Sequence, residues 1–175
     1  GTSEKPYSVI LNVTQKQVQD IAVGLFRMPI DIEFLYADGS SEKRSAMVDK
    51  AQHTFHFNTT KAPVTVVFDA GSYVIKTLEM QKSSREWLWQ LEHGSSMLDR
   101  YDALLALRGN VALFKNVAHG GTSVQQGNTQ VHNYRTTLEQ AWKREYFREM
   151  QVEIATQWLS LPEIFNAAIN IKSDH

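Results

Sequence analysis

The sequence contains no cysteine, and this absence excludes disulfides, thiolate zinc sites and cysteine catalysis. It also lacks an excess of charge: a net charge of −1 gives no electrostatic footprint for nucleic acid or an anionic membrane. No apolar run approaches the roughly 20 residues that span a bilayer, and no signal-peptide pattern opens the sequence. We therefore expect neither a nucleic-acid partner nor a membrane partner, and the compartment stays open.

What remains is the composition of an ordinary globular protein. The 175 residues are 42% apolar and 21% charged, which is enough to bury a core in one large domain or two small ones. The sequence begins Gly-Thr-Ser without a methionine, so we expect it to be a piece of a longer protein.

The first eighty residues alternate between apolar and polar side chains, as β-strands do. Asp38-Gly39 predicts a tight hairpin, Lys61-Ala62-Pro63 predicts a break, and Asp69-Ala70-Gly71 predicts a further turn. Five to seven short strands at this spacing indicate an antiparallel β-sandwich over residues 1–82. The expected strands are Tyr7–Val13, Ile30–Tyr36, Arg44–Val48, Thr54–Phe57, Val64–Phe68 and Tyr73–Ile75.

From residue 83 the apolar period becomes that of helices, and we expect a helical domain over residues 83–175. Ser83 and Glu86 fit a capping box, and Gly94 is a helix stop. Trp87, Leu88 and Leu91 share one face, and we expect the first two to pack against the sandwich. Further expected features are a cap at Ser95 or Ser96, a helix ending at Gly109, an apolar segment over 111–117, a polar loop over 119–128, helices around Leu138–Trp142 and Val152–Leu159, and a last helix from Pro162 through Ile169.

A weak internal echo links two of these helices. The stretch Arg100–Leu107 resembles Gln151–Trp158, about fifty residues later. A small-residue helix that recurs after another helix is typical of stacked HEAT or armadillo pairs. The sequence therefore predicts a β-sandwich followed by an all-α HEAT/armadillo-like domain, an α+β chain with the two kinds of structure segregated.

Glutamate and histidine stand together at residues 92 and 93, which raises the question of zinc chemistry. A zinc peptidase needs H-E-x-x-H to place two imidazoles one helical turn apart, and the sequence has no His-Glu dipeptide. Glu92-His93 has the reverse order, so we interpret it as the polar last turn of a helix. His53 and His56 should point to opposite faces of a strand. The remaining histidines, expected in loops or at the terminus, are His119, His132 and His175.

Motifs for nucleophilic catalysis and phosphate binding are also missing. There is no G-x-S-x-G elbow, so Ser72 is interpreted as a turn residue, and Gly120-Gly121 lacks a following Lys-Ser/Thr. Asp99 and Asp102 share a helical face beside Arg100, and we expect them to be surface charges. The sequence thus predicts no catalytic, cofactor-binding or metal-binding residue in this chain.

Two further motifs can be interpreted either as functional sites or as ordinary structural residues. Trp87 and Trp89 suggest a carbohydrate platform, but on an amphipathic helix one should be core and the other partly exposed. Asn12-Val13-Thr14 and Asn58-Thr59-Thr60 match the N-glycosylation sequon, which has meaning only in a chain secreted by a eukaryote.

Four stretches stand in an order that carries a family resemblance. They are Asn12–Gln17, Leu25–Phe34 with its Phe-Arg-Met-Pro, Val66–Lys76, and Lys82–Leu107. In this order they resemble the first strand, the sandwich start, the closing hairpin and the first helices of the C-terminal region of the aminopeptidase N family of zinc metallopeptidases. The resemblance runs through residues 7–108, continues weakly from 137 to 161, and leaves the 109–133 loop unmatched.

The resemblance implies a non-catalytic C-terminal fragment of a zinc aminopeptidase, whose parent removes N-terminal residues from peptides. The family's H-E-x-x-H and G-x-M-E-N motifs do not occur here. Zinc is therefore implied only for the missing catalytic domain, which would be this chain's partner, and peptide substrate would be met only indirectly. The sandwich would act as a rigid spacer, and the helical domain would close over the catalytic cleft.

Two other classes of function stay open. One is an interaction platform from a catalytically inactive aminopeptidase-like protein, whose upstream sequence would lack H-E-x-x-H. The other is a free-standing adhesion or carbohydrate module, which needs an exposed row of aromatic side chains on one sheet face.

Overall fold

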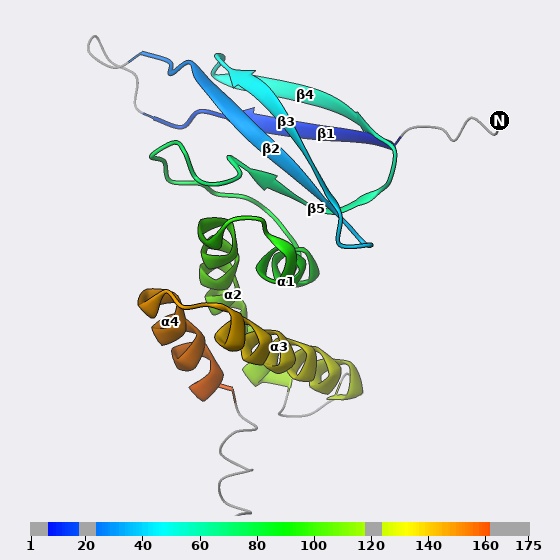
Figure 1. Ribbon diagram of the computed structural model, residues 1–175, viewed down its shortest axis with the longest axis vertical. Coiled ribbons are helices and arrows are strands. Elements are labelled where there is room, and N and C mark those ends of the chain that lie inside the picture. The colour runs from blue at the N-terminus through cyan, green and yellow to red at the C-terminus, as the bar shows by residue number, and fades with distance from the viewer. Residues whose placement is uncertain (1–6, 18–23, 118–123, 162–175) are drawn as a thin grey trace, which may run out of the picture. The chain divides into compact units, whose positions relative to one another are not determined.

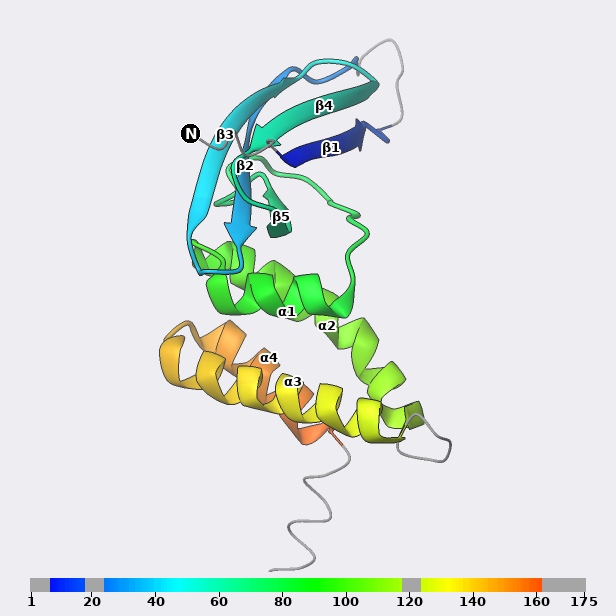
Figure 2. The same ribbon diagram turned by 90° about the vertical axis from the view of Figure 1, so that its right-hand side faces the viewer.

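The computed structural model describes residues 7–17, 24–117 and 124–161, and it describes side chains in these ranges outside residues 109–133. The chain divides into two compact units, residues 1–80 and 81–175. In the described residues, five antiparallel strands in two sheets occupy the first unit and four helices occupy the second, which makes an α+β fold. Figures 1 and 2 show the strands and helices segregated along the chain.

Every stretch of alternating residues before the Asp69 turn forms a strand, as predicted. The two-stranded sheet pairs β1 with β4, and the three-stranded sheet has β2 between β3 and β5. Asp38-Gly39 joins β2 to β3, and Gly39 has a φ of +79°, a region that glycine enters without strain. The strands are β1 (Tyr7–Thr14), β2 (Met28–Tyr36), β3 (Ser41–Val48), β4 (Gln52–Thr59) and β5 (Pro63–Phe68).

The two sheets share one hydrophobic cluster. Because successive side chains of a strand point to opposite faces, every second residue of β2 enters this cluster, and Ile30, Ile32 and Phe34 are fully buried. Phe34 meets Phe57 of β4 edge to face, with ring centroids 5.3 Å apart. Phe55 of β4 packs against the same cluster, and so do three residues of β1, Val9, Leu11 and Val13.

The strand predicted at Tyr73–Ile75 is absent, and this prediction was wrong. The turn before it is confirmed, since Asp69 and Gly71 both have positive φ. The Asp69 carboxylate accepts a hydrogen bond from the Val74 N–H at 3.0 Å and one from the Lys76 ammonium at 2.5 Å. A side chain therefore engages the backbone that a strand would have used for pairing.

Helix α1 begins and ends where the sequence predicts. Ser83 Oγ accepts from the Glu86 N–H at 3.3 Å, and Glu86 Oε2 accepts from the Ser83 N–H at 2.8 Å, which completes the capping box. A second pair of the same kind, Ser96 and Asp99, stands at the start of α2. The helices are α1 (Ser84–His93), α2 (Met97–Val117), α3 (Val124–Arg144) and α4 (Arg148–Leu159).

The predicted boundaries around residues 109–128 were wrong. Helix α2 continues through Gly109 to Val117, and α3 starts within the predicted polar loop, so that His132 lies in a helix. A single glycine costs a helix only about 1 kcal/mol, which is too little to end one that its neighbours continue. The helix predicted after Pro162, and the residues His119, Gly120-Gly121 and His175, lie outside the described residues.

The helical unit has its own hydrophobic cluster. Trp87 and Leu88 are partly buried and pack against this cluster. The fully buried side chains of the cluster include Leu91, Leu104, Leu107, Tyr134, Leu138, Met150 and Ile154.

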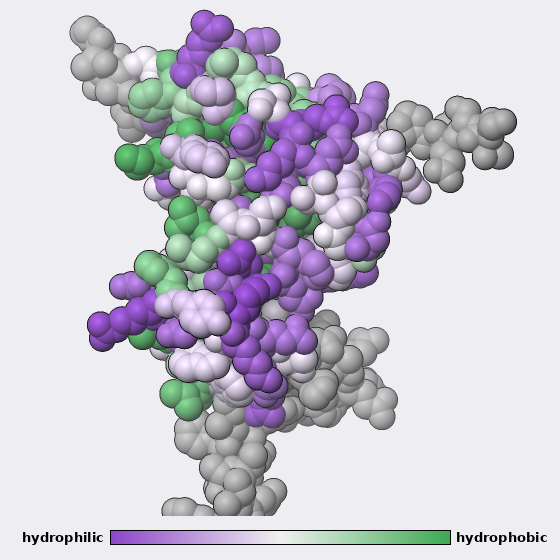
Figure 3. All heavy atoms as spheres, in the orientation of Figure 1, coloured by the Kyte–Doolittle hydropathy of each residue, from purple (hydrophilic) through white to green (hydrophobic). Residues whose placement is uncertain are grey.

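Outside these clusters the surface is mixed. Polar side chains cover much of the face in Figure 3, with apolar residues among them. None of the helices in the described part of the chain is both long and apolar enough to cross a membrane.

Replacing Phe34 with alanine should lower the free energy of unfolding of the first unit by about 3–5 kcal/mol, because a fully buried phenylalanine leaves a cavity. Phe26→Ala is the matched control, since Phe26 is 52% exposed, and it should change stability by no more than about 0.5 kcal/mol. Urea unfolding followed by circular dichroism measures both. Equal losses in the two variants would contradict the assignment of the core.

Candidate functional site

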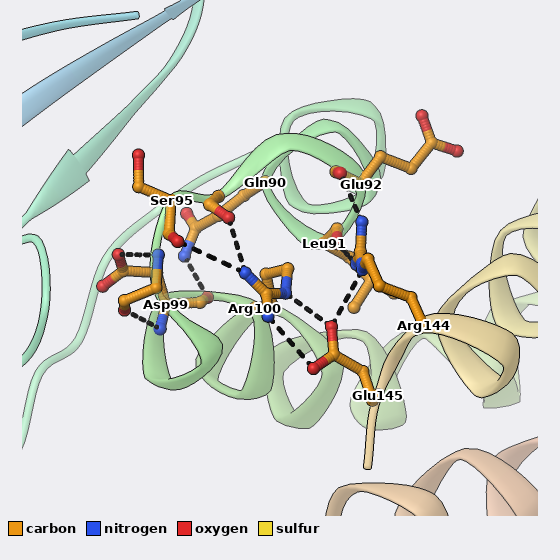
Figure 4. A network of polar contacts seen from close by, with 10 residues as sticks. Gln90, Leu91, Glu92, Ser95, Asp99, Arg100, Arg144 and Glu145 are labelled. Atoms are coloured by element: carbon orange, nitrogen blue, oxygen red, sulfur yellow. Dashed lines mark hydrogen bonds and ion pairs between the residues drawn. The ribbon is translucent and has the colours of Figure 1, made fainter. Parts of the chain in front are cut away.

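A buried carboxylate joins two arginines at the corner where α1, α2 and α3 meet. Glu145 is 4% exposed, and its two oxygens accept hydrogen bonds from Nε and Nη2 of Arg100 on α2, at 2.6 and 3.0 Å. Nε of Arg144, at the end of α3, donates to Oε1 of the same carboxylate at 2.9 Å. Figure 4 shows these groups converging. The fork-to-fork geometry is the strong form of an ion pair.

The same arginines cap the C-terminus of α1. The last carbonyls of a helix have no partner within the helix. Arg144 donates to the carbonyl oxygens of Leu91 and Glu92, each at 2.7 Å, and Arg100 Nη1 donates to that of Gly94 at 2.9 Å. Positive charge at this end also complements the helix dipole. The network therefore ties the end of α1 to both α2 and α3.

Residue 94 has no room for a side chain at this corner, which explains the glycine there. Its φ of −56° is open to any residue, but a Cβ would lie 2.7 Å from the carbonyl oxygen of Gln90 and 3.2 Å from Cγ of Arg100. Its N–H donates to that Gln90 oxygen at 2.8 Å. A side chain here would push Arg100 away from the carboxylate it binds.

Asp99 corrects one expectation from the sequence. It is 1% exposed, so it is not a surface charge; it accepts from the Ser96 N–H as part of the α2 cap, and its own carbonyl accepts from Nε2 of Gln90 at 2.7 Å. Asp102 is exposed, as predicted.

A second network with the same chemistry lies between α2 and α4. Glu153, 5% exposed, accepts from Nε of Arg108 at 2.8 Å and from Nε2 of Gln157 at 2.6 Å. Gln157 also donates to the Leu104 carbonyl at 2.8 Å and accepts from the Tyr134 hydroxyl. Burial, and then the charge of Glu153, raise the pKa of Tyr134 above its usual range.

The pKa of Glu145 does not suit proton transfer near neutral pH. Burial alone would raise the pKa of Glu145, but the hydrogen bonds from Arg100 and Arg144 outweigh it and hold that pKa below its ordinary value. Arginine keeps its charge throughout. A buried carboxylate that stays ionised and fully paired stabilises a corner; a general acid or base needs a pKa nearer the working pH.

Lys82, in the segment before α1, has an unusual pKa. Burial lowers this pKa to about 8, against the opposing influence of Glu86, Asp99 and Asp102. Its ammonium lies 4.5 Å from the centre of the Trp87 ring and donates to the side chain of Gln90. These contacts hold it as a packing element at the base of α1.

The Glu92-His93 pair lies in the last turn of α1, as predicted. The His93 ring stacks on Trp89 with centroids 4.0 Å apart, and its Nδ1 is 3.2 Å from the Trp89 carbonyl oxygen. Glu92 accepts a hydrogen bond from Thr137 at 2.5 Å. Both members of the pair are thus engaged within the helical unit. Trp87 and Trp89 are each half-buried, so neither offers a flat exposed platform.

The histidines of β4 do not converge. His53 is half-buried against Phe55, with ring centroids 4.0 Å apart, while His56 is exposed on the opposite face. In the described ranges, no group of three or more His, Cys, Asp or Glu side chains could hold a metal ion.

Comparison with known proteins adds a likeness of fold. No family model and no curated protein matches the sequence. The chain is similar in structure to Legionella pneumophila aminopeptidase A, solved in complex with aspartic acid, with a TM-score of 0.54 and 15% identity over 86% of this chain. At this identity the likeness shows the fold alone. It covers 18% of the other protein, so this chain spans less than a fifth of that protein's length.

Replacing Glu145 with glutamine should make stability less dependent on pH. Because the folded state lowers the pKa of Glu145, its contribution is full at neutral pH and is lost as the pH falls through and below 4.5, its ordinary value. At pH 7 the variant should be less stable on the order of 3 kcal/mol, since Arg100 loses its charged partner, and the difference should shrink in acid.

Chemical unfolding at a series of pH values measures this difference. Glu149→Gln, at an exposed position in the first turn of α4, is the control and should follow the parent curve. A Glu145→Gln curve that stays parallel to the parent from pH 7 into acid would contradict the role of the ionised carboxylate.

Proposed function

We propose that this chain is a non-catalytic, C-terminal part of a zinc aminopeptidase. In the proposal, the two-sheet unit is a rigid spacer and the helical unit is a scaffold that closes over the catalytic cleft. One observation carries it: a chain whose sequence stretches resemble the aminopeptidase N family also resembles a solved aminopeptidase in fold over 86% of its length. That share exceeds either unit alone, so the likeness includes residues of both.

Zinc, in this proposal, belongs to a catalytic domain outside this chain. The described histidines are separated by the faces of β4 or stacked on aromatic rings. The buried carboxylates of Glu145 and Glu153 are bound to arginines. Zinc needs three or four convergent nitrogen, sulfur or oxygen ligands, and the described side chains do not fit it.

A constant offset supports a HEAT-like stacking of the helices. Three polar pairs join residues 45 positions apart: Glu92 with Thr137, Arg100 with Glu145, and Arg108 with Glu153. The first pair joins α1 to α3, the second joins α2 to the turn between α3 and α4, and the third joins α2 to α4. Repeats of about 40–47 residues that stack in register give such an offset. A scaffold built this way would be stiff, because charged side chains fix its layers in register.

The purified chain should neither retain stoichiometric zinc nor hydrolyse an amino-acid arylamide in the presence of zinc. The full-length parent should do both, through an H-E-x-x-H upstream of this chain. Metal analysis and a chromogenic assay measure the two properties. A parent without that motif would favour the inactive interaction platform. Turnover by the purified chain that requires zinc and is abolished in His53→Ala/His56→Ala would contradict the proposal.

A further inference from the structure

Each sequon exposes its asparagine together with its threonine hydroxyl; the first lies on β1, and the second begins at Asn58 in β4 and ends at Thr60, one residue beyond that strand. A sequon places asparagine two residues before threonine, and a strand brings every second side chain to the same face. Asn12 and Thr14 are accordingly exposed on β1, with Val13 turned into the hydrophobic cluster between them. Asn58 and Thr60 are exposed in the same way.

The two asparagines stand on one face of one sheet. In the β1–β4 ladder Asn12 is opposite Thr54 and Asn58 is opposite Ser8, so they are four residues apart along the strands, roughly 14 Å at the usual rise. Thr54 Oγ1 donates to the Oδ1 of Asn12 at 2.8 Å. This bond uses the oxygen of the Asn12 amide, whereas N-glycosylation takes place at the amide nitrogen, Nδ2.

The β1–β4 sheet has few of the features that prevent edge strands from pairing with other chains. Among the described strands, β1 and β4 form a sheet of two, so each has an outer edge. Neither contains Lys, Arg, Asp, Glu or Pro, whereas β3 carries Glu42, Lys43 and Arg44, and β5 begins with Pro63. Charges and prolines are the usual means of preventing edge strands from pairing with other chains.

An exposed apolar side chain lies between the two sequons. Ile10 is 58% exposed, and it is opposite His56, midway along the ladder between Asn12 and Asn58. A bulky hydrophilic group on each asparagine would flank this residue and both strand edges, because glycans are large and solubilising.

We propose that, when this chain passes through a eukaryotic secretory pathway, the outer face of the β1–β4 sheet carries glycans, with Asn12 and Asn58 as acceptors of an N-linked oligosaccharide. The donor is an oligosaccharide joined through its anomeric carbon to a lipid pyrophosphate. Nδ2 forms a bond to that carbon, the bond from that carbon to the pyrophosphate oxygen breaks, and the lipid pyrophosphate leaves with the electron pair. One amide proton passes to a base of the transferase, and no oxidation or reduction occurs.

The test is to express the whole chain behind a cleavable secretion signal in eukaryotic cells and to analyse its peptides by mass spectrometry. Both asparagines should carry hexose-rich glycans that an amide-releasing glycosidase removes, leaving aspartate. Thr14→Ala and Thr60→Ala should each lose one glycan although the asparagine remains, and Thr14→Ser should keep it. Unmodified Asn12 and Asn58 in the secreted chain would overturn the proposal.

Aggregation tests the shielding that the glycans provide. The secreted Asn12→Gln/Asn58→Gln variant should scatter more light at equal concentration than the glycosylated chain, and adding Ile10→Lys should reduce that scattering. Since the folded core is unchanged, all three proteins should have similar circular dichroism. Glycosylated and unglycosylated chains that aggregate equally would overturn the shielding role. Neither result depends on whether the parent is an aminopeptidase.

Discussion

The ion pair between Arg100 and Glu145 is the interaction on which the packing of the helical unit depends. A carboxylate that is 4% exposed would cost several kcal/mol if it were left without a partner. Two guanidinium groups neutralise it, and their remaining donors occupy the carbonyl groups at the end of α1. One buried charge therefore fixes the positions of three helices. The Arg108–Glu153 pair repeats this arrangement further along α2 and α4.

The same arrangement is the reason why we propose a scaffold role for the charged residues of the helical unit. A catalytic group needs a pKa near the working pH and access to a substrate, but the pKa of Glu145 is held below its ordinary value, and Glu145 and Glu153 are both buried and already hydrogen-bonded to arginines. Lys82 has a pKa near 8 because of burial, and its ammonium is held against Trp87 and Gln90. A stiff helical layer of this kind fits a part that shapes a cleft formed elsewhere, as proposed above.

Local patterns in the sequence predicted much of the fold. Alternation in β1 and β2, the Asp38-Gly39 hairpin and the Ser83–Glu86 capping box depend on residues close in sequence, and all three are confirmed. The networks could not be predicted, because Glu145 and Glu153 look like surface charges until α2 brings an arginine to each. The strand predicted at Tyr73–Ile75 is absent for a similar reason, because it depends on a contact that the local pattern does not reveal. The alternation of this segment is that of a strand, but the Asp69 side chain accepts a hydrogen bond from its backbone.

A double-mutant cycle between Arg100 and Glu145 tests the structural role of the network most directly. The variants Arg100→Met and Glu145→Leu, singly and together, are compared in free energy of unfolding at neutral pH and low salt. Each single change should cost about 3–5 kcal/mol, because it leaves the other charge buried. The double variant should cost less than their sum by about 1–3 kcal/mol. Single costs that add within about 0.5 kcal/mol would contradict the claim that this pair holds the helices together.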